Sequence, residues 1–357
     1  MTSGKSNIST IKKTFGYMLP FALMIIFLYF AFKDVDIKEA FDRIALLSIP
    51  WLFLFVGVFF FSHFLRALRW KYILNTVKPN TEIKNLFGAT MIGYGINCVV
   101  PRLGELYRAL FLGRWENLSR SSMLGTIVVE RVVDIIGLFF AVLLSILIFP
   151  GNLLEEIVWL KSAMAIVFTG ILGVILFIIL LVRFKEKFYN VILKWIGKFS
   201  EKVAGKLGYI FHMLTDGFAS LSGKKNYIIT IALTIVILVV YGVNSLLGFY
   251  LLRMDEIQPV TFSMAWISMT ILAFGVIIPT PGGTGSYHAI TILVLVSIFN
   301  FSNEAAAAYA ILTHLISTII FIITTFLSVY VVNKSRAKKG KSVETFFSVL
   351  KLNTEPK

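Results

Sequence analysis

Apolar residues occur along this chain in long continuous runs, not in alternating or short amphipathic patterns. A helix needs about 20 apolar residues to cross the roughly 30 Å hydrocarbon core of a bilayer. Six runs meet or approach that length, over residues 15–32, 51–68, 121–149, 161–182, 227–252 and 305–332. Because the runs are continuous, they exclude a closed β-barrel, whose strands alternate between two faces. The pattern predicts an all-α polytopic integral membrane protein with six to eight transmembrane helices.

Two further apolar regions, 84–114 and 263–300, are interrupted by proline and glycine. The first break lies at residues 101–104 and the second at residues 279–285. Backbone freed from helical hydrogen bonds cannot face lipid, so it has to be buried in protein or line a polar cavity. We expect re-entrant broken helices at both places; packing kinks or, for the second region, two ordinary short spans are the alternatives. The opposite topologies expected for the two regions leave open an inverted repeat, as in transporters that bind substrate at such breaks.

The composition agrees with a membrane protein. Of the 357 residues, 57% are apolar and 15% are charged, and the mean hydropathy is +0.84. Soluble domains carry roughly 45–50% apolar and about 25% charged residues. This difference excludes a soluble globular enzyme and a disordered protein. Cys98 is the single cysteine, so no internal disulfide can form.

The net charge of +15 is distributed unevenly over the loops. One set of loops and tails carries 24 Lys and Arg residues, in 1–14, 66–86, 183–226 and 333–357. The other set carries five, in 33–50, 150–161 and 253–262. Because basic loops stay in the cytoplasm, both termini are predicted there. The charge therefore indicates topology, and we expect no nucleic-acid partner.

These signals divide the chain into three parts. We predict a cytoplasmic N-terminal tail over 1–14, a transmembrane domain over 15–332 and a basic cytoplasmic tail over 333–357. Segment 184–226, inside the second part, is too polar to span a membrane. Its apolar residues recur at helical spacing with lysines between them, so we predict an amphipathic helix lying on the inner leaflet. No appended soluble catalytic domain is expected.

Three charged residues fall inside one predicted span. Glu130, Arg131 and Asp134 lie about a third of the way into it, where an unpaired charge is expensive. Glu130 and Asp134 share a helix face, and Arg131 can reach Asp134. We expect this group to relay protons or to contact a lipid headgroup. A structural ion pair that holds helices together is the alternative.

The residues around the first break offer anion-binding chemistry. The guanidinium groups of Arg102 and Arg108 match phosphate bidentately. We expect both to receive a headgroup while Glu105 orients one of them, and we add Asn97, just before the break, as a binding residue. Arginines that merely obey the positive-inside rule are the alternative.

At the second break, Gly282 and Gly283 would expose backbone groups, with the hydroxyls of Thr280 and Thr284 beside them. This chemistry suits substrate or ion binding at the end of a half-helix. A tight structural turn is the alternative.

The remaining polar residues have simpler interpretations. Arg66, Arg69 and Trp70 end the second span, where snorkelling arginines and an interfacial tryptophan explain them; binding is the alternative, with Arg69 as the candidate. The histidines, among them His288 and His314, are isolated in the sequence. Since a metal site needs clustered ligands, we expect no metal and no cofactor.

Four ordered motifs resemble a known family. They are Arg66-Ala-Leu-Arg69-Trp70, Asn97 followed by Pro101-Arg102-x-Gly104-Glu105-x-x-Arg108, Glu130-Arg131-Val-Val-Asp134, and Pro279-Thr-Pro-Gly-Gly-x-Gly285. Over roughly 10–335 the chain is similar to the flippase-like membrane region of lysylphosphatidylglycerol synthases and to its stand-alone relatives. The resemblance implies lipid translocation across a bacterial inner membrane. The chain departs from it at Tyr287 and His288, where many relatives carry an acidic residue, and we expect no aminoacyl-transferase domain.

We therefore expect a lipid flippase or transporter, not an enzyme, in the bacterial inner membrane. By the resemblance, its substrate is an aminoacyl-phospholipid or a polyprenyl-phosphate-linked glycolipid, so its partners are anionic or phosphate-bearing membrane lipids. Two other functions stay open: an intramembrane lipid-modifying enzyme with Glu130 or Asp134 as the general base, and a non-catalytic membrane scaffold for envelope assembly. The sequence sets no oligomeric state.

Overall fold

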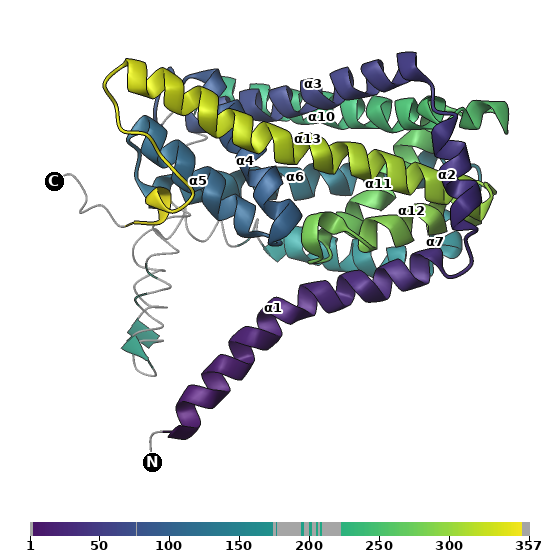
Figure 1. Cartoon of the computed structure of the whole chain (residues 1–357), viewed down its shortest axis with the longest axis horizontal. Helices are drawn as coiled ribbons and strands as arrows, with labels where there is room; N and C mark the ends of the chain where they lie inside the picture. The colour runs from purple at the N-terminus through teal and green to yellow at the C-terminus, as the bar shows by residue number, and fades with distance from the viewer. Residues whose placement is uncertain are drawn as a thin grey trace. The chain divides into compact units, whose positions relative to one another are not determined.

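The computed structural model describes residues 3–75, 77–173 and 223–351, with isolated positions between 176 and 208 (Figure 1). Its helices are α1 (Ser3–Phe32), α2 (Ile37–Ala45), α3 (Ile49–Leu74), α4 (Ile83–Val99), α5 (Leu103–Glu116), α6 (Arg120–Ile148), α7 (Leu153–Glu156), α10 (Lys224–Leu251), α11 (Phe262–Ile277), α12 (Ser286–Ser297) and α13 (Asn303–Lys338). Three 3₁₀ turns accompany them: η1 (Met254–Glu256), η2 (Pro281–Gly283) and η3 (Ser348–Leu350). The described part of the chain contains no strand.

Among the described residues, four helices are long and apolar enough to cross a membrane, namely α3, α6, α10 and α13. The end of α1 (Met18–Phe32) and α2 form a fifth candidate, a pair bent by 85°. These helices coincide with five of the six predicted runs. The sixth run begins in a shorter apolar helix, Val158–Gly173, and its remainder lies outside the described residues. The prediction of an all-α membrane protein is confirmed.

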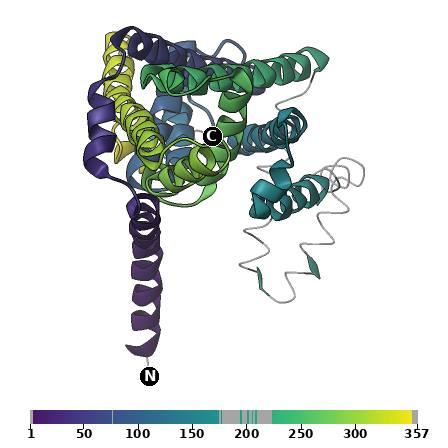
Figure 2. The ribbon, with the colours of Figure 1, turned by 90° about the vertical axis from the view of Figure 1, so that its right-hand side faces the viewer.

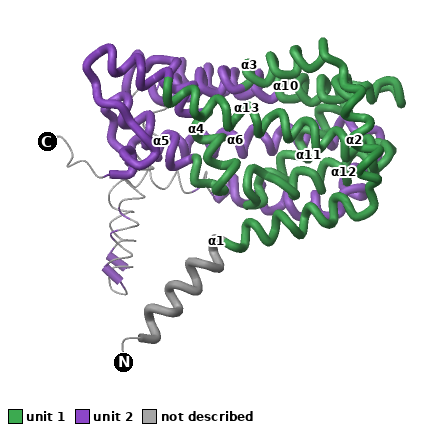
Figure 3. The backbone as a smooth tube through the Cα atoms, viewed as in Figure 1, with its two compact units in different colours: residues 1–62, 91–104, 239–330 green, residues 63–90, 105–238, 331–357 purple. Residues whose placement is uncertain are grey.

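The described residues form two compact units, coloured separately in Figure 3. Unit 1 contains residues 1–62, 91–104 and 239–330, and unit 2 contains residues 63–90, 105–238 and 331–357. The predicted amphipathic segment 184–226 lies outside the described residues, apart from isolated positions and its last few residues.

The chain leaves the helical conformation at both predicted breaks. Between α4 and α5, Arg102 has a left-handed backbone (φ 64°), and the N–H of Gly104 donates to the Asn97 side-chain oxygen at 2.8 Å. Glycine is required at position 104 because a Cβ there would lie 1.8 Å from the carbonyl oxygen of Gly93. Between α11 and α12, the turn contains Gly282, Gly283 and Gly285, all with positive φ. Within unit 1, α12 packs against α11 and α1 (Figures 1 and 2).

The segment predicted as a basic tail has defined structure within unit 2. Helix α13 continues to Lys338, beyond the predicted boundary. Arg336 is buried and donates to the backbone carbonyl of Trp115 at 2.6 Å. After the helix, the ring of Phe346 lies 5.4 Å from that of Phe111. These contacts fix the segment against α5.

Candidate functional site

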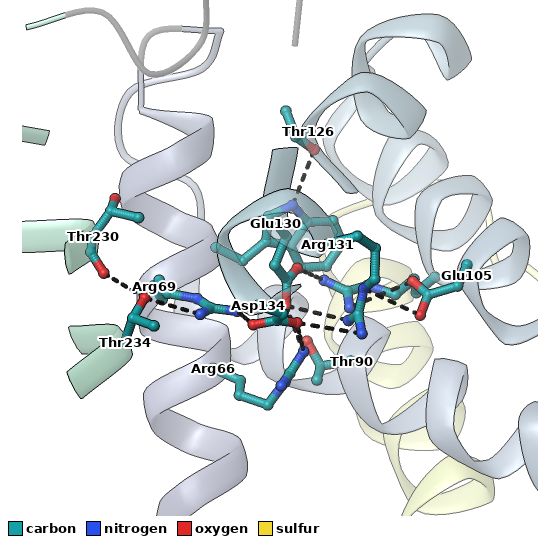
Figure 4. Close-up of polar contacts among 12 residues, drawn as sticks. Arg66, Arg69, Thr90, Glu105, Thr126, Glu130, Arg131, Asp134, Thr230 and Thr234 are labelled. Carbon is teal, nitrogen blue, oxygen red and sulfur yellow. Dashed lines mark hydrogen bonds and ion pairs between the residues drawn. The ribbon is translucent and has the colours of Figure 1, made fainter. Parts of the chain in front are cut away.

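Unit 2 brings seven charged side chains together, and we name them the arginine cluster (Figure 4). Three helices supply them: Arg66 and Arg69 from α3, Glu105 and Arg108 from α5, and Glu130, Arg131 and Asp134 from α6. Residues three and four apart share a helix face. Each helix therefore carries its two or three charged residues within about one turn, on the face that contributes to the cluster.

Glu130 is the centre of the cluster. Its carboxylate is fully buried, and four guanidinium groups surround it. Arg66 donates to Oε1 at 2.9 Å and Arg69 at 3.3 Å, while Arg108 hydrogen-bonds Oε2. Arg131 lies 3.5 Å from Oε1. One carboxylate thus holds arginines from all three helices.

Asp134 lies one turn further along α6 and shares three of these arginines. Arg66 donates to Oδ2 at 2.9 Å, and Arg69 hydrogen-bonds Oδ1. Arg131 lies 3.3 Å away, so the predicted contact between Arg131 and Asp134 is present. Asp134 and Glu130 together hold Arg66 and Arg69 in one place on α3.

The cluster has a buried base and a more accessible rim. The side chains of Arg66, Arg69 and Arg108 are buried, whereas those of Arg131 and Glu105 are 38% and 31% exposed. At the rim, Arg131 lies 3.5 Å from Glu105, and Arg108 lies 3.9 Å from the same carboxylate. Charge-assisted hydrogen bonds are usually about 2.7–2.9 Å long. Glu105 is therefore held more loosely than Glu130.

Neutral side chains position the arginines of the cluster. The indole ring of Trp70 lies 4.1 Å from the guanidinium carbon of Arg108, and its N–H donates to Thr126 at 3.0 Å. Arg69 donates to Thr234 of α10 at 3.1 Å. Cation–π stacking and these hydrogen bonds restrict how each guanidinium group can turn.

The interpretation of Arg66, Arg69 and Trp70 as snorkelling and interfacial residues is wrong. Trp70 and Arg69 are fully buried, and Arg66 is nearly so. The reason is that α6 offers carboxylates at the level of the two arginines. Arg66 and Trp70 are thus parts of the site that sequence reasoning undervalued. The sequence did contain a signal for this site. Arg66 and Arg69 share one face of a predicted span, and Glu130 and Asp134 share one face of another, so the two faces carry complementary charges.

Asn97 and Arg102, predicted to bind a headgroup, belong to unit 1 and not to the cluster. Asn97 accepts the Gly104 N–H and so stabilises the break. Arg102 is exposed and donates to the carbonyl of Ile277 at 3.1 Å, where α11 ends.

The second break forms a neutral polar network in unit 1. The hydroxyls of Thr280 and Ser286 lie 2.9 Å apart, and Ser286 donates to the carbonyl of Gly275 at 2.7 Å. The N–H of Thr284 donates to Pro281 and that of Gly283 to Thr280, which closes the turn.

The histidines near this break are not isolated. The rings of His288 and His314 lie 4.8 Å apart, and His314 Nε2 lies 3.0 Å from the carbonyl oxygen of Gly282. The described residues include no group of three or more His, Cys, Asp or Glu side chains that could hold a metal ion.

Comparison with known proteins finds a membrane-protein family and two membrane proteins that are similar to this chain. The family described as the lysylphosphatidylglycerol synthase TM region matches residues 17–324. The UPF0104 membrane protein MJ1595 of Methanocaldococcus jannaschii is 24% identical over 284 residues, which cover 77% of this chain and 83% of that protein. The UPF0104 membrane protein MJ1078 of the same organism is 28% identical over 253 residues, covering 69% of this chain and 98% of that protein. No solved structure matches the chain.

Proposed function

The chain belongs to the family of the lysylphosphatidylglycerol synthase TM region, and from this membership we propose that it moves a phosphate-bearing lipid across a membrane. The name of the family refers to a lipid with a phosphodiester and a basic headgroup. The proposed substrate is an aminoacyl-phospholipid or a polyprenyl-phosphate-linked glycolipid. The proposed location is a bacterial inner membrane. The distribution of Lys and Arg over the loops supports a topology with both termini in the cytoplasm.

The observation that carries the proposal is the charge of the arginine cluster. Four guanidinium groups from α3, α5 and α6 face three carboxylates, and α3 and α6 are candidate membrane spans. This arrangement leaves one positive charge in excess. Unpaired charge is expensive inside a membrane. A phosphate group that enters at the rim would balance this charge, and guanidinium groups bind phosphate through two parallel hydrogen bonds.

We assign the rim and the base different roles. Arg131 receives the phosphate because it is the most exposed arginine of the cluster, and Arg108 contacts it from below. Glu105 is the partner that the phosphate displaces, since its contacts with both arginines are long. Glu130 and Asp134 keep the remaining arginines in place. In this scheme no bond of the lipid is broken, so we propose transport without catalysis.

Reconstitution into proteoliposomes tests this function. We would follow a fluorescent phosphatidylglycerol as it moves between leaflets, by quenching the outer leaflet with dithionite. A fluorescent glucosylceramide, which has no phosphate, is the matched lipid. The full-length protein should accelerate movement of the phospholipid over protein-free vesicles and leave the glycolipid unchanged.

Variants distinguish lipid movement that depends on the arginine cluster from lipid movement that any inserted membrane protein would cause. Arg131→Gln should slow phospholipid movement about tenfold, because one charge-assisted contact is lost. Arg43→Gln is the control, since Arg43 forms an exposed pair with Glu39 at 2.8 Å in α2. Equal rates for both lipids, or an Arg131→Gln rate equal to wild type, would refute the proposal.

A further inference from the structure

An open pocket lies in unit 2 where one helix begins and two others end. The start of α4, the end of α5 and the end of α13 line it, together with Lys339 and Lys341 just after α13. We name it the helix-end pocket. It shares no residue with the arginine cluster, and neither the proposed function nor the resemblance to the family uses it.

The helix-end pocket is rich in cations. Four basic side chains line it against two carboxylates. Lys84 and Lys339 both pair with Glu82, at 3.1 and 3.0 Å. Hydrogen bonds from Lys339 and Lys84 hold the pKa of Glu82 below its usual value. This carboxylate therefore stays charged but compensates only one of its two lysines.

The other two cations of the pocket, Arg336 and Lys341, take part in none of the salt bridges found among the described residues. Arg336 is buried and donates to backbone carbonyl oxygens, at 2.9 Å to Ser342 and 2.6 Å to Trp115. The second carboxylate, Glu116, is paired outside the pocket with Lys78 at 2.9 Å. The pocket therefore has uncompensated positive charge.

Two buried polar atoms in the lining have no hydrogen-bond partner among the described residues: the Oδ1 of Asn85 and the indole N–H of Trp115. Asn85 is 7% exposed and Trp115 is 2% exposed. The amide nitrogen of Asn85 donates to Glu116 at 2.7 Å, which turns Oδ1 away from that carboxylate. A buried polar atom without a partner is costly. Both residues line the pocket, so its wall contains one acceptor and one donor without a partner in addition to its cations.

We infer that the helix-end pocket binds a phosphate group that keeps a hydrogen-bond donor beside its negative charge. Arg336, Lys341 and the Trp115 N–H face the anionic oxygens, and Asn85 Oδ1 accepts from a P–OH or from a neighbouring hydroxyl. The amino end of α4, which begins at Ile83, favours the same charge. A lipid headgroup and a free phosphate compound share this chemistry.

Inorganic phosphate and sulfate are the probes for this site. The two ions have similar shape, but at neutral pH only phosphate keeps an O–H that can donate to Asn85. We would measure the thermal midpoint of the full-length protein in an uncharged detergent against the concentration of each ion, because a ligand that binds only the folded state raises that midpoint. Phosphate should produce a saturable rise, and sulfate should bind several-fold more weakly.

Three variants locate the effect. Lys341→Gln removes an exposed cation, and Trp115→Phe removes the N–H but keeps the aromatic bulk. Each should weaken phosphate binding roughly three- to tenfold. Lys338→Gln is the matched control, since Lys338 is exposed at the end of the same helix and does not line the pocket. Should Trp115→Phe fail to fold, Lys341→Gln alone decides.

Nanodiscs separate the two sources of phosphate. If a lipid headgroup occupies the pocket, phosphatidylglycerol added to phosphatidylcholine nanodiscs should suppress the effect of inorganic phosphate. If the ligand is a free phosphate compound, the effect should be the same in both nanodiscs. Equal effects of phosphate and sulfate, or a phosphate effect that is unchanged in Lys341→Gln, would overturn the inference. Neither result depends on lipid movement, so the failure of this site is distinguishable from that of the proposed function.

Discussion

The arginine cluster of unit 2 and the second break of unit 1 both contain buried polar groups, but they satisfy those groups differently. The cluster uses full charges from three helices, and its contacts join residues 61 to 68 positions apart between α3 and α6. The break uses hydroxyl and carbonyl groups, and its central hydrogen bond joins residues only 11 positions apart. One network is charged and long-range, whereas the other is neutral and mainly local.

This difference affects both stability and function. Removing one member of a charged network leaves buried charges uncompensated, whereas removing one hydroxyl loses only neutral hydrogen bonds. A network with excess charge can also exchange one of its partners for an external anion. A neutral network that closes on itself has no comparable driving force, so we assign substrate binding to the cluster and architecture to the break.

The largest effect is expected from Glu130→Gln. Arg66, Arg69 and Arg108 all bind this carboxylate. Its replacement by a neutral amide leaves the positive charge of these buried arginines uncompensated. Breaking a buried ion pair on one side costs about 3–5 kcal/mol. The measurement is the free energy of unfolding in mixed micelles as SDS is titrated.

The control for Glu130→Gln is Glu39→Gln in α2, where the carboxylate pairs with Arg43 at the surface. An exposed pair of this kind contributes about 0.3–0.5 kcal/mol. If both variants lose the same small amount, the cluster does not stabilise unit 2, and the contrast between the two networks disappears.

A smaller but still large effect is expected at the second break from Gly285→Ala. Gly285 has φ 86°, which alanine rarely adopts, and a Cβ there would lie 2.6 Å from the carbonyl oxygen of Met24. Backbone strain and the clash together should destabilise unit 1 by about 2–4 kcal/mol. Thermal unfolding in detergent measures this loss.

Gly170→Ala is the matched control, because nothing lies within 4 Å of a Cβ at Gly170 and alanine favours a helix by up to about 1 kcal/mol. A melting temperature of Gly285→Ala at or above that of the control would show that the turn does not need its left-handed glycine.

Much of the fold could be predicted from the sequence because its signals are local. Long apolar runs indicate spans, and proline with glycine indicates a break; both features are present in α3, α6 and the turn between α11 and α12. The contact between Arg131 and Asp134 was predictable for the same reason, since three residues on one helix share a face. Within one element, spacing alone determines the neighbours.

The partners of Arg66 and Arg69 could not be predicted in this way. Their contacts depend on how α3 packs against α6 and α5, and a single sequence does not give this packing. Snorkelling explained the same residues equally well at the level of one helix. The proximity of His288 to His314 and the burial of Arg336 beside Trp115 have the same origin, because each joins elements that are distant in sequence.

An intermediate effect is expected from Arg69→Lys, which separates charge from geometry in the cluster. Arg69 is fully buried and reaches Glu130, Asp134 and Thr234 at once. Lysine keeps the charge but lacks the planar fork that makes three directed contacts. We expect a loss of about 1–2 kcal/mol in the same SDS titration, with Arg43→Lys in α2 nearly unchanged. A loss as large as that of Glu130→Gln would mean that geometry, not charge balance, determines the stability of the cluster.

The smallest effect is expected from Ser286→Ala in the neutral network. The Ser286 hydroxyl donates to the carbonyl of Gly275 and lies 2.9 Å from the Thr280 hydroxyl, so alanine removes these neutral hydrogen bonds without adding volume or strain. A neutral hydrogen bond contributes about 0.5–1.5 kcal/mol, and Thr280 can turn to recover part of it. Thermal unfolding should therefore show a loss well below that of Gly285→Ala, and lipid movement in proteoliposomes should stay at the wild-type rate. A Ser286→Ala protein that is stable but no longer moves lipid would contradict the division of roles, because the break would then take part in binding and not only in architecture.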